Sequence, residues 1–325
     1  MLFKGQKIGK YQVLEAIGSG GFGSVYLAKD TWIGKHVALK IPHKQGEDVE
    51  KLLKEPRLLA ALDHPHIVTV ITAEKTNELF YIVMEYVDGT SLEQLIRKQR
   101  KLDVKQGLIW FLQICDALGY AHGKKVIHRD IRPANVLISQ DHLVKVTDFG
   151  TSRFLIENQF ASTRVGSPPY MAPEHFSGRA TLQSDIYSLG VLMYECLAGR
   201  LPFFDTNPAK VAQMAREGNV KAPHHHNSAI PLELSQVILK SMAPALSQRY
   251  AAVEDVATAL RKIQASQSQS SQDLAHLVEV ESGPVVVAAT PRRETRHMGN
   301  LFCWNCGRPI SKRTQSCPHC DVQQY

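Results

Sequence analysis

The order of apolar and polar residues changes character along the first 263 residues. The early runs Tyr11–Leu14, Ser24–Ala28 and His36–Lys40 are short and rich in β-branched and aromatic residues, which is typical of strands. From about residue 103 onward, apolar residues recur at helical spacing, as in Leu108–Ala121 and Asp185–Leu197. A strand-rich part followed by a helical part predicts an α+β fold of two lobes with a cleft between them.

The alternation of apolar strand-like and helix-like runs ends near residue 263. The following run, Gln264–Gln272, consists of Gln, Ser and Ala and is too polar to form a core. The last 25 residues contain four of the six cysteines. We therefore predict a main domain over residues 1–263, a flexible linker over 264–300 and a small cysteine-rich module over 301–325.

Composition narrows the class of protein only slightly. The hydrophobic fraction of 44% suits a folded protein, and the net charge of +7 is spread along the chain, so it gives little support for nucleic-acid binding. No apolar run approaches the ~20 residues that span a bilayer, and Met1–Gly5 lacks the apolar core expected of a signal peptide. We expect a cytoplasmic protein, in which Cys115 and Cys196 are buried thiols.

A glycine-rich run follows the first predicted strand. Residues Gly18–Val25 fit the spacing G-x-G-x-x-G-x-V, and glycines allow the backbone to approach phosphate oxygens. In dinucleotide-binding crossovers the same string opens a helix, whereas the residues after Gly23 are strand-like. The run therefore predicts a loop between two strands that covers phosphates, with a plain surface hairpin as the alternative.

A lysine ends the third predicted strand, in Val37–Lys40. Its side chain either extends to solvent or supplies the cation for the α- and β-phosphates, oriented by a carboxylate. Glu55 is the expected partner. Pro56 lacks an N–H group, so we expect the helix that contains both residues to kink or break there.

Two further motifs follow in order, His128–Asn135 and Thr147–Gly150. Phosphoryl transfer requires a divalent cation, a carboxylate near the attacking hydroxyl and cations for the developing charge. Hard oxygen ligands suit Mg²⁺ or Mn²⁺, so we expect Asn135 and Asp148 to be metal ligands. Asp130 is the expected acceptor of the hydroxyl proton.

With these motifs, residues 11–263 resemble the eukaryotic-like serine/threonine protein kinases, and Tyr81–Gly89 is similar to the hinge of their bacterial branch. The resemblance implies the two-lobed kinase fold and transfer of the ATP γ-phosphate to protein Ser/Thr hydroxyls. It also implies that Met84 is the gatekeeper and that the backbones of Glu85 and Val87 bind the adenine. The implied nucleotide contacts are Ile17, Gly18, Ser19, Gly20, Gly21, Phe22, Gly23, Val25, Ala38, Lys40, Met84, Glu85, Val87 and Leu137.

The family pattern also extends to the second half of the domain. Gly166–Glu174 resembles the end of an activation segment, Asp185 is expected to brace the catalytic loop, and Arg249 to pair with Glu174. Arg132 stands where Ser/Thr members usually have Lys, which we expect to alter activity without abolishing it. A pseudokinase scaffold remains an alternative. Kinases of small molecules are disfavoured because they lack the segment that resembles Gly166–Glu174.

Regulation by phosphorylation is also predicted from the resemblance. In the family, an arginine like Arg129 joins other cations in binding a phosphorylated residue of the activation loop. Ser162 and Thr163 lie in the corresponding stretch. We predict autophosphorylation of one of them, through a transient homodimer; the alternative is that both are ordinary loop residues.

The C-terminal cysteines form two C-x-x-C pairs, Cys303 with Cys306 and Cys317 with Cys320. Two such turns can supply a closed tetrahedral S₄ site, and metal binding would provide much of the folding free energy of so short a module. The pattern resembles a zinc ribbon with a structural Zn²⁺, and disulfides or a rubredoxin-like iron are the alternatives. We expect its partner to be a protein in preference to a nucleic acid.

Overall fold

The computed structural model describes residues 2–20, 23–43, 53, 56–57, 59–76, 79–149, 167–280, 301–302 and 309–310, with side chains up to residue 267. The chain divides into two compact units, Met1–Gln272 and Asp273–Tyr325. Several predicted site residues lie outside the described residues: Gly21, Phe22, Glu55, Ser162, Thr163, Cys303, Cys306, Cys317 and Cys320.

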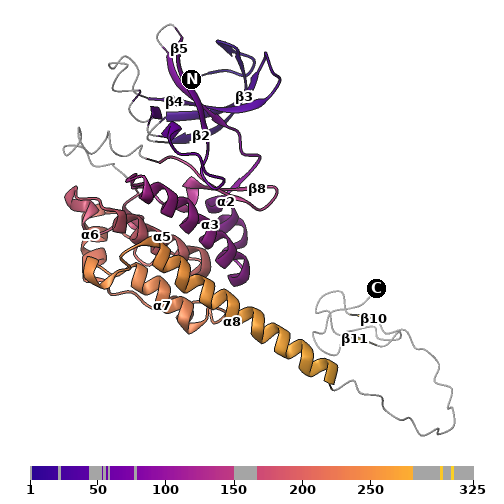
Figure 1. The fold of residues 1–325 in the computed structure, drawn as a ribbon, viewed down its shortest axis with the longest axis vertical. Coiled ribbons are helices and arrows are strands. Elements are labelled where there is room, and N and C mark those ends of the chain that lie inside the picture. Colours follow the sequence, from indigo (N-terminus) through magenta and orange to yellow (C-terminus); the bar gives the residue numbers. More distant parts are fainter. Residues whose placement is uncertain are drawn as a thin grey trace, which may run out of the picture. The chain divides into compact units, whose positions relative to one another are not determined.

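The first part of unit Met1–Gln272 is an antiparallel sheet of six strands in the order β1-β2-β3-β4-β6-β5 (Figure 1). The first residue of β3 must be glycine, because φ of Gly23 is 154° and a Cβ there would lie 2.3 Å from the Ile41 oxygen of the neighbouring strand. The strands are β1 (Lys7–Ile8), β2 (Tyr11–Gly20), β3 (Gly23–Asp30), β4 (His36–Pro42), β5 (Val70–Thr76) and β6 (Leu79–Glu85).

The second part of the same unit is helical and lies below the sheet in Figure 1. Its α-helices are α2 (Leu92–Gln99), α3 (Val104–Gly123), α5 (Leu182–Ala198), α6 (Pro208–Glu217), α7 (Leu232–Ser241) and α8 (Val253–Val280). A small sheet has the order β7-β8-β9, with strands β7 (Gly89–Ser91), β8 (Val136–Ser139) and β9 (Val144–Val146). The 3₁₀ helices are η1 (Pro133–Asn135), η2 (Pro168–Tyr170), η3 (His175–Ser177), η4 (Pro223–His225) and η5 (Leu246–Gln248).

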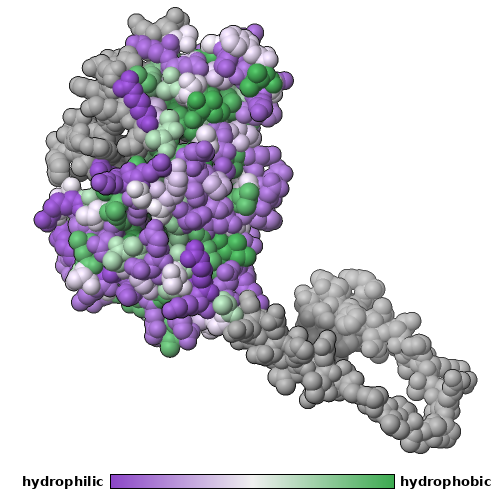
Figure 2. Space-filling view, in the orientation of Figure 1, coloured by the Kyte–Doolittle hydropathy of each residue, from purple (hydrophilic) through white to green (hydrophobic). Residues whose placement is uncertain are grey.

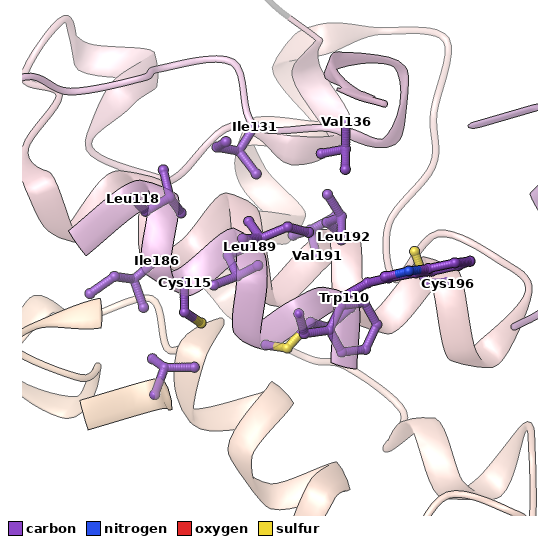
Figure 3. Close-up of a cluster of buried hydrophobic side chains, with 14 of the residues drawn as sticks. Trp110, Cys115, Leu118, Ile131, Val136, Ile186, Leu189, Val191, Leu192 and Cys196 are labelled. Atoms are coloured by element: carbon purple, nitrogen blue, oxygen red, sulfur yellow. The ribbon is translucent and has the colours of Figure 1, made fainter. Parts of the chain in front are cut away.

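The core of this helical lobe is built on α3 and α5. Both helices are apolar over most of their circumference, and their side chains pack against residues that follow α3, such as Ile131 and Val136 (Figure 3). Cys115 and Cys196 are buried free thiols, as predicted, and burial raises the pKa of Cys115 to about 12. This core fixes the loop that follows α3, which carries the candidate site.

Local signals define where these helices begin and end. Asp103 caps α3 by accepting a hydrogen bond from the Gln106 N–H, and α2 begins with a capping box between Ser91 and Gln94. Gly199, with φ of 72°, ends α5 in the left-handed conformation. The visible face of the unit is mostly hydrophilic (Figure 2), as expected when the apolar faces pack inward.

One expectation about local structure differs from the fold. In place of the linker expected from residue 264, α8 continues to Val280, because Gln, Ala and Leu favour helix even where there is little to bury. Leu53 and Pro56 are in helical conformation, but Lys54 and Glu55 lie outside the described residues, so the kink or break expected at Pro56 stays a prediction.

In unit Asp273–Tyr325, β10 (Leu301–Phe302) pairs with β11 (Pro309–Ile310). Among the described residues, no helix combines the length and apolar character that crossing a bilayer requires.

Candidate active site

Two charged side chains from different lobes meet in the site. Lys40 is near the end of β4, and Asp148 follows β9 with φ of 64°. The Lys40 Nζ donates a 2.7 Å hydrogen bond to the Asp148 Oδ1. Burial opposes the charge of Asp148, but the ammonium outweighs it and holds the carboxyl pKa below its ordinary value. Asp148 is therefore ionised at neutral pH, with a lysine held beside it.

Asp130 lies in the loop between α3 and η1 and is 5% exposed. The Asn135 Nδ2 donates to its Oδ2 at 2.9 Å and to its backbone oxygen at 2.8 Å. The Arg132 Nε is 3.5 Å from its Oδ2, an ion pair at longer range. Burial raises the pKa of Asp130 above its ordinary value despite Arg132 and His128. The site thus contains a carboxylate whose negative charge is only partly offset by its neighbours, so its affinity for a proton is raised.

Asn135 and Asp148 suit a hard divalent cation. Asn135 uses its amide nitrogen on Asp130, which directs its Oδ1 the other way. Asp148 supplies a carboxylate, one oxygen of which accepts the hydrogen bond from Lys40. Amide and carboxylate oxygens are the ligands that Mg²⁺ prefers, so these residues fit the ion that the sequence implies.

A second aspartate, Asp185, is hydrogen-bonded to the backbone of the loop that contains Asp130. The Asp185 Oδ2 accepts hydrogen bonds from the His128 N–H and the His122 Nε2, both at 2.8 Å, and its Oδ1 accepts one from the Arg129 N–H at 2.8 Å. Burial opposes ionisation, but these donors keep the pKa of Asp185 below its ordinary value. The bracing role predicted for Asp185 is confirmed. His122 was not predicted, because 63 residues separate it from Asp185.

Five of the expected nucleotide contacts belong to one apolar cluster. Ala38 and Met84 are buried in it and are register partners in β4 and β6, while Val25, Val87 and Leu137 pack against it. Ile17 is 45% exposed and is not part of this cluster. Side chains from both lobes therefore share one apolar surface.

The segment that resembles the end of an activation segment contacts the loop of Asp130. The Arg132 Nη1 donates to the Ser167 Oγ at 2.8 Å, a contact that sequence reasoning missed. The signal for it was the position of Ser167 inside Gly166–Glu174, already assigned to this segment. Arg249 pairs with Glu174 at 2.8 and 3.2 Å, as predicted.

The model of the protein kinase domain matches residues 11–261. The serine/threonine-protein kinase PrkC of Bacillus subtilis is 35% identical over 255 residues, which cover 76% of this chain and 39% of that protein. The serine/threonine-protein kinase PknB of Mycolicibacterium smegmatis is 34% identical over 273 residues, covering 80% and 44%. The chain thus spans about two fifths of the length of these curated relatives, and it belongs to the protein kinase family.

Proposed function

We propose that this protein is a serine/threonine protein kinase that transfers the γ-phosphoryl group of ATP to Ser or Thr hydroxyls of proteins. One observation carries the proposal: Asp130 and Asn135 are hydrogen-bonded to each other, and Lys40 reaches Asp148 from the other lobe. The relatives named as serine/threonine-protein kinases support the class of acceptor.

In the proposed reaction, the acceptor oxygen forms a bond to the γ-phosphorus while the bond from that phosphorus to the β–γ bridging oxygen breaks, releasing ADP. Asp130 accepts or orients the hydroxyl proton, and its raised pKa suits proton transfer. Lys40 binds the phosphates with its charge fixed by Asp148. A bound Mg²⁺ would supply charge neutralisation at the phosphates, held by Asn135 and Asp148.

Transfer of labelled γ-phosphate to a protein acceptor tests this function. We expect wild-type protein to transfer label and Asp130→Asn to transfer far less, while both bind ATP. The rival pseudokinase scaffold predicts equal, background transfer by both proteins. A small-molecule kinase would label small alcohols or amines and leave the protein acceptor unlabelled.

Autophosphorylation of Thr163 or Ser162 is part of the proposal, through a transient homodimer. Arg129 supports it, because its backbone is fixed by Asp185 beside the catalytic loop. Phosphopeptide mapping of active protein should find one of the two sites modified, and Asp130→Asn protein expressed alone should carry neither. Active protein without phosphate at either residue would refute this part.

We further propose that residues 301–325 form a zinc ribbon with structural Zn²⁺ bound by Cys303, Cys306, Cys317 and Cys320. The pairing of β10 with β11 supports it, since these strands flank the first C-x-x-C pair in the sequence. Metal analysis should find about one zinc per chain. Cys317→Ser should lose it, whereas Cys115→Ser, at a buried thiol of the kinase domain, should retain it.

The ribbon is proposed to bind a protein partner and so to target or regulate the kinase. A cytoplasmic location belongs to the same proposal, since reduced thiols such as Cys115 and Cys196 are typical of that compartment.

A further inference from the structure

The hinge between the lobes, residues 85–88, is hydrogen-bonded at both of its ends to the hairpin of β8 and β9. Each set of contacts is called a fastening below. The first fastening is at Glu85, the last residue of β6. Its Oε1 accepts a 2.7 Å hydrogen bond from the Lys145 Nζ of β9 and a 2.8 Å hydrogen bond from the Thr69 N–H. The Glu85 N–H also donates to the Thr69 oxygen at 2.9 Å. Glu85 is therefore held on both its backbone and its side chain.

The second fastening is three residues further on, at Asp88. The Gln140 N–H donates to the Asp88 backbone oxygen at 3.0 Å, and the Gln140 Nε2 donates to its Oδ2 at 2.9 Å. Gln140 follows β8, and Lys145 lies on β9, so both fastenings come from the hairpin that these two strands form. Leu137, a register partner of Lys145, belongs to the apolar adenine cluster.

Between these contacts, the hinge borders an open pocket of about 360 Å³ whose lining does not include Ala38, Met84 or Leu137 of the apolar cluster. Tyr86 and Val87 therefore have an open space on this side in place of a packed layer of side chains. Val87 packs against the apolar cluster, so the path of this backbone depends on that contact and on where its two ends are held.

The first fastening is the stronger of the two. The Lys145 and Glu85 side chains are 19% and 29% exposed, so water screens this pair less than a surface pair. Gln140 and Asp88 are exposed, and their bonds lack a cation.

We propose that Lys145 is a positioning residue for the nucleotide, which acts through Glu85 to set the hinge backbone against the adenine. The proposal rests on the adenine site of the proposed function. Lys145 itself touches neither the phosphates nor Asp130 in this scheme. Its loss is therefore expected to weaken recognition of the adenosine part of ATP and to leave the phosphate part and kcat close to their wild-type values.

The experiment compares two halves of the nucleotide as probes, adenosine and magnesium tripolyphosphate, by calorimetry on the full chain. For Lys145→Met we expect adenosine affinity to fall about fivefold, the size that losing one partly exposed ion pair allows, and tripolyphosphate affinity to stay the same. Lys145→Arg should restore much of the adenosine affinity. Lys29→Met, at an exposed lysine of β3, is the matched control and should change neither.

Kinetics and a double-mutant cycle supply the second readout. Lys145→Met should raise the KM for ATP with kcat within about twofold, and Gln140→Ala should act in the same direction but less. Because Lys145 acts through the carboxylate, adding Glu85→Gln to Lys145→Met should cost little more than either change alone. If Lys145→Met proves too unstable to assay, Lys145→Arg, Glu85→Gln and Gln140→Ala carry the comparison.

The outcomes separate clearly. Unchanged adenosine affinity, equal loss with both probes, or fully additive effects of the Lys145 and Glu85 changes would overturn the positioning role. Wild-type protein that binds tripolyphosphate but no adenosine would refute the adenine site of the proposed function instead.

Discussion

One buried aspartate, Asp130, lies in the catalytic loop, and another, Asp185, holds the backbone of that loop. The surroundings of the two carboxylates shift their pKa values in opposite directions. Asp185 is fully buried, and three donors, His122 and the N–H groups of His128 and Arg129, satisfy its carboxylate. Asp130 is almost as buried, but it has one short side-chain hydrogen bond, from Asn135, and an arginine 3.5 Å away. The pKa of Asp185 is accordingly lowered, while burial raises that of Asp130.

This difference distinguishes an aspartate that stabilises the fold, Asp185, from one that can take part in the reaction, Asp130. A carboxylate whose two oxygens are both held by protein donors stabilises the fold and is poorly suited to binding a substrate. A carboxylate that burial penalises costs folding free energy, and it retains an affinity for protons that a reaction can use. The four predictions below test this contrast, from the largest expected effect to the smallest.

Asp130→Asn should reduce the rate of phosphoryl transfer by a factor of ~10² to 10⁴, the usual contribution of a positioned base. Stability should change in the other direction, because the neutral amide removes the cost of a buried charge. We expect the melting temperature to rise or to stay unchanged, as measured by calorimetry with the metal chelated. A marked fall in melting temperature would place Asp130 in the supporting class with Asp185.

Asp185→Ala should destabilise the protein by about 3–5 kcal/mol, because the donors that it satisfies would be left buried without a partner. Urea unfolding measures the change. Activity should fall in proportion to the loss of folded protein and of the loop geometry. A ligand that binds the folded state tightly should recover part of that activity. A fully stable but inactive variant would contradict the supporting role.

Arg132→Lys should lower kcat about tenfold, because an ammonium loses the planar geometry that reaches Ser167 and Asp130 together. Ser167→Ala is the matched change on the other side of the contact. If the contact is what matters, the double variant should lose little more than Arg132→Lys alone. Independent, multiplying losses would show that Arg132 acts without Ser167.

The two aspartates should also respond oppositely to pH, which urea midpoints between pH 3 and 7 would show. The lowered pKa of Asp185 means that its stabilisation is complete above the ordinary value of 3.8 and is lost as pH falls through the lower folded value. The advantage of wild type over Asp185→Asn should therefore shrink toward pH 3. For Asp130, the raised pKa means that protonation favours the folded state, so the gain from Asp130→Asn should appear above 3.8 and disappear below it. Parallel pH profiles would remove the contrast.

Much of the site could be predicted from the sequence because its motifs are local. Asp130 and Asn135 are five residues apart, and η1 brings them together without help from distant segments. The glycine at residue 23 is required by its own backbone conformation. The strand-to-helix change along the chain likewise follows from local periodicity. The helix that continues through residues 264–280 was missed because its low apolar content resembles a linker.

Contacts between distant residues could not be predicted in the same way. Arg132 with Ser167, His122 with Asp185 and Lys145 with Glu85 are separated by 35, 63 and 60 residues. Each residue type is compatible with an ordinary solvated surface, and only the fold brings its partner within reach.

By itself, the sequence determined which groups are available for chemistry: the glycine-rich loop, Lys40, Asp130, Asn135 and Asp148, in the order that a protein kinase requires. The tertiary structure decided what each carboxylate is free to do. Burial and the number of donors set the proton affinity of Asp130 and Asp185 in opposite directions, and both depend on packing around the loop. The sequence determines the type of each side chain, whereas the pKa of that side chain depends on neighbouring groups that only the folded chain brings together.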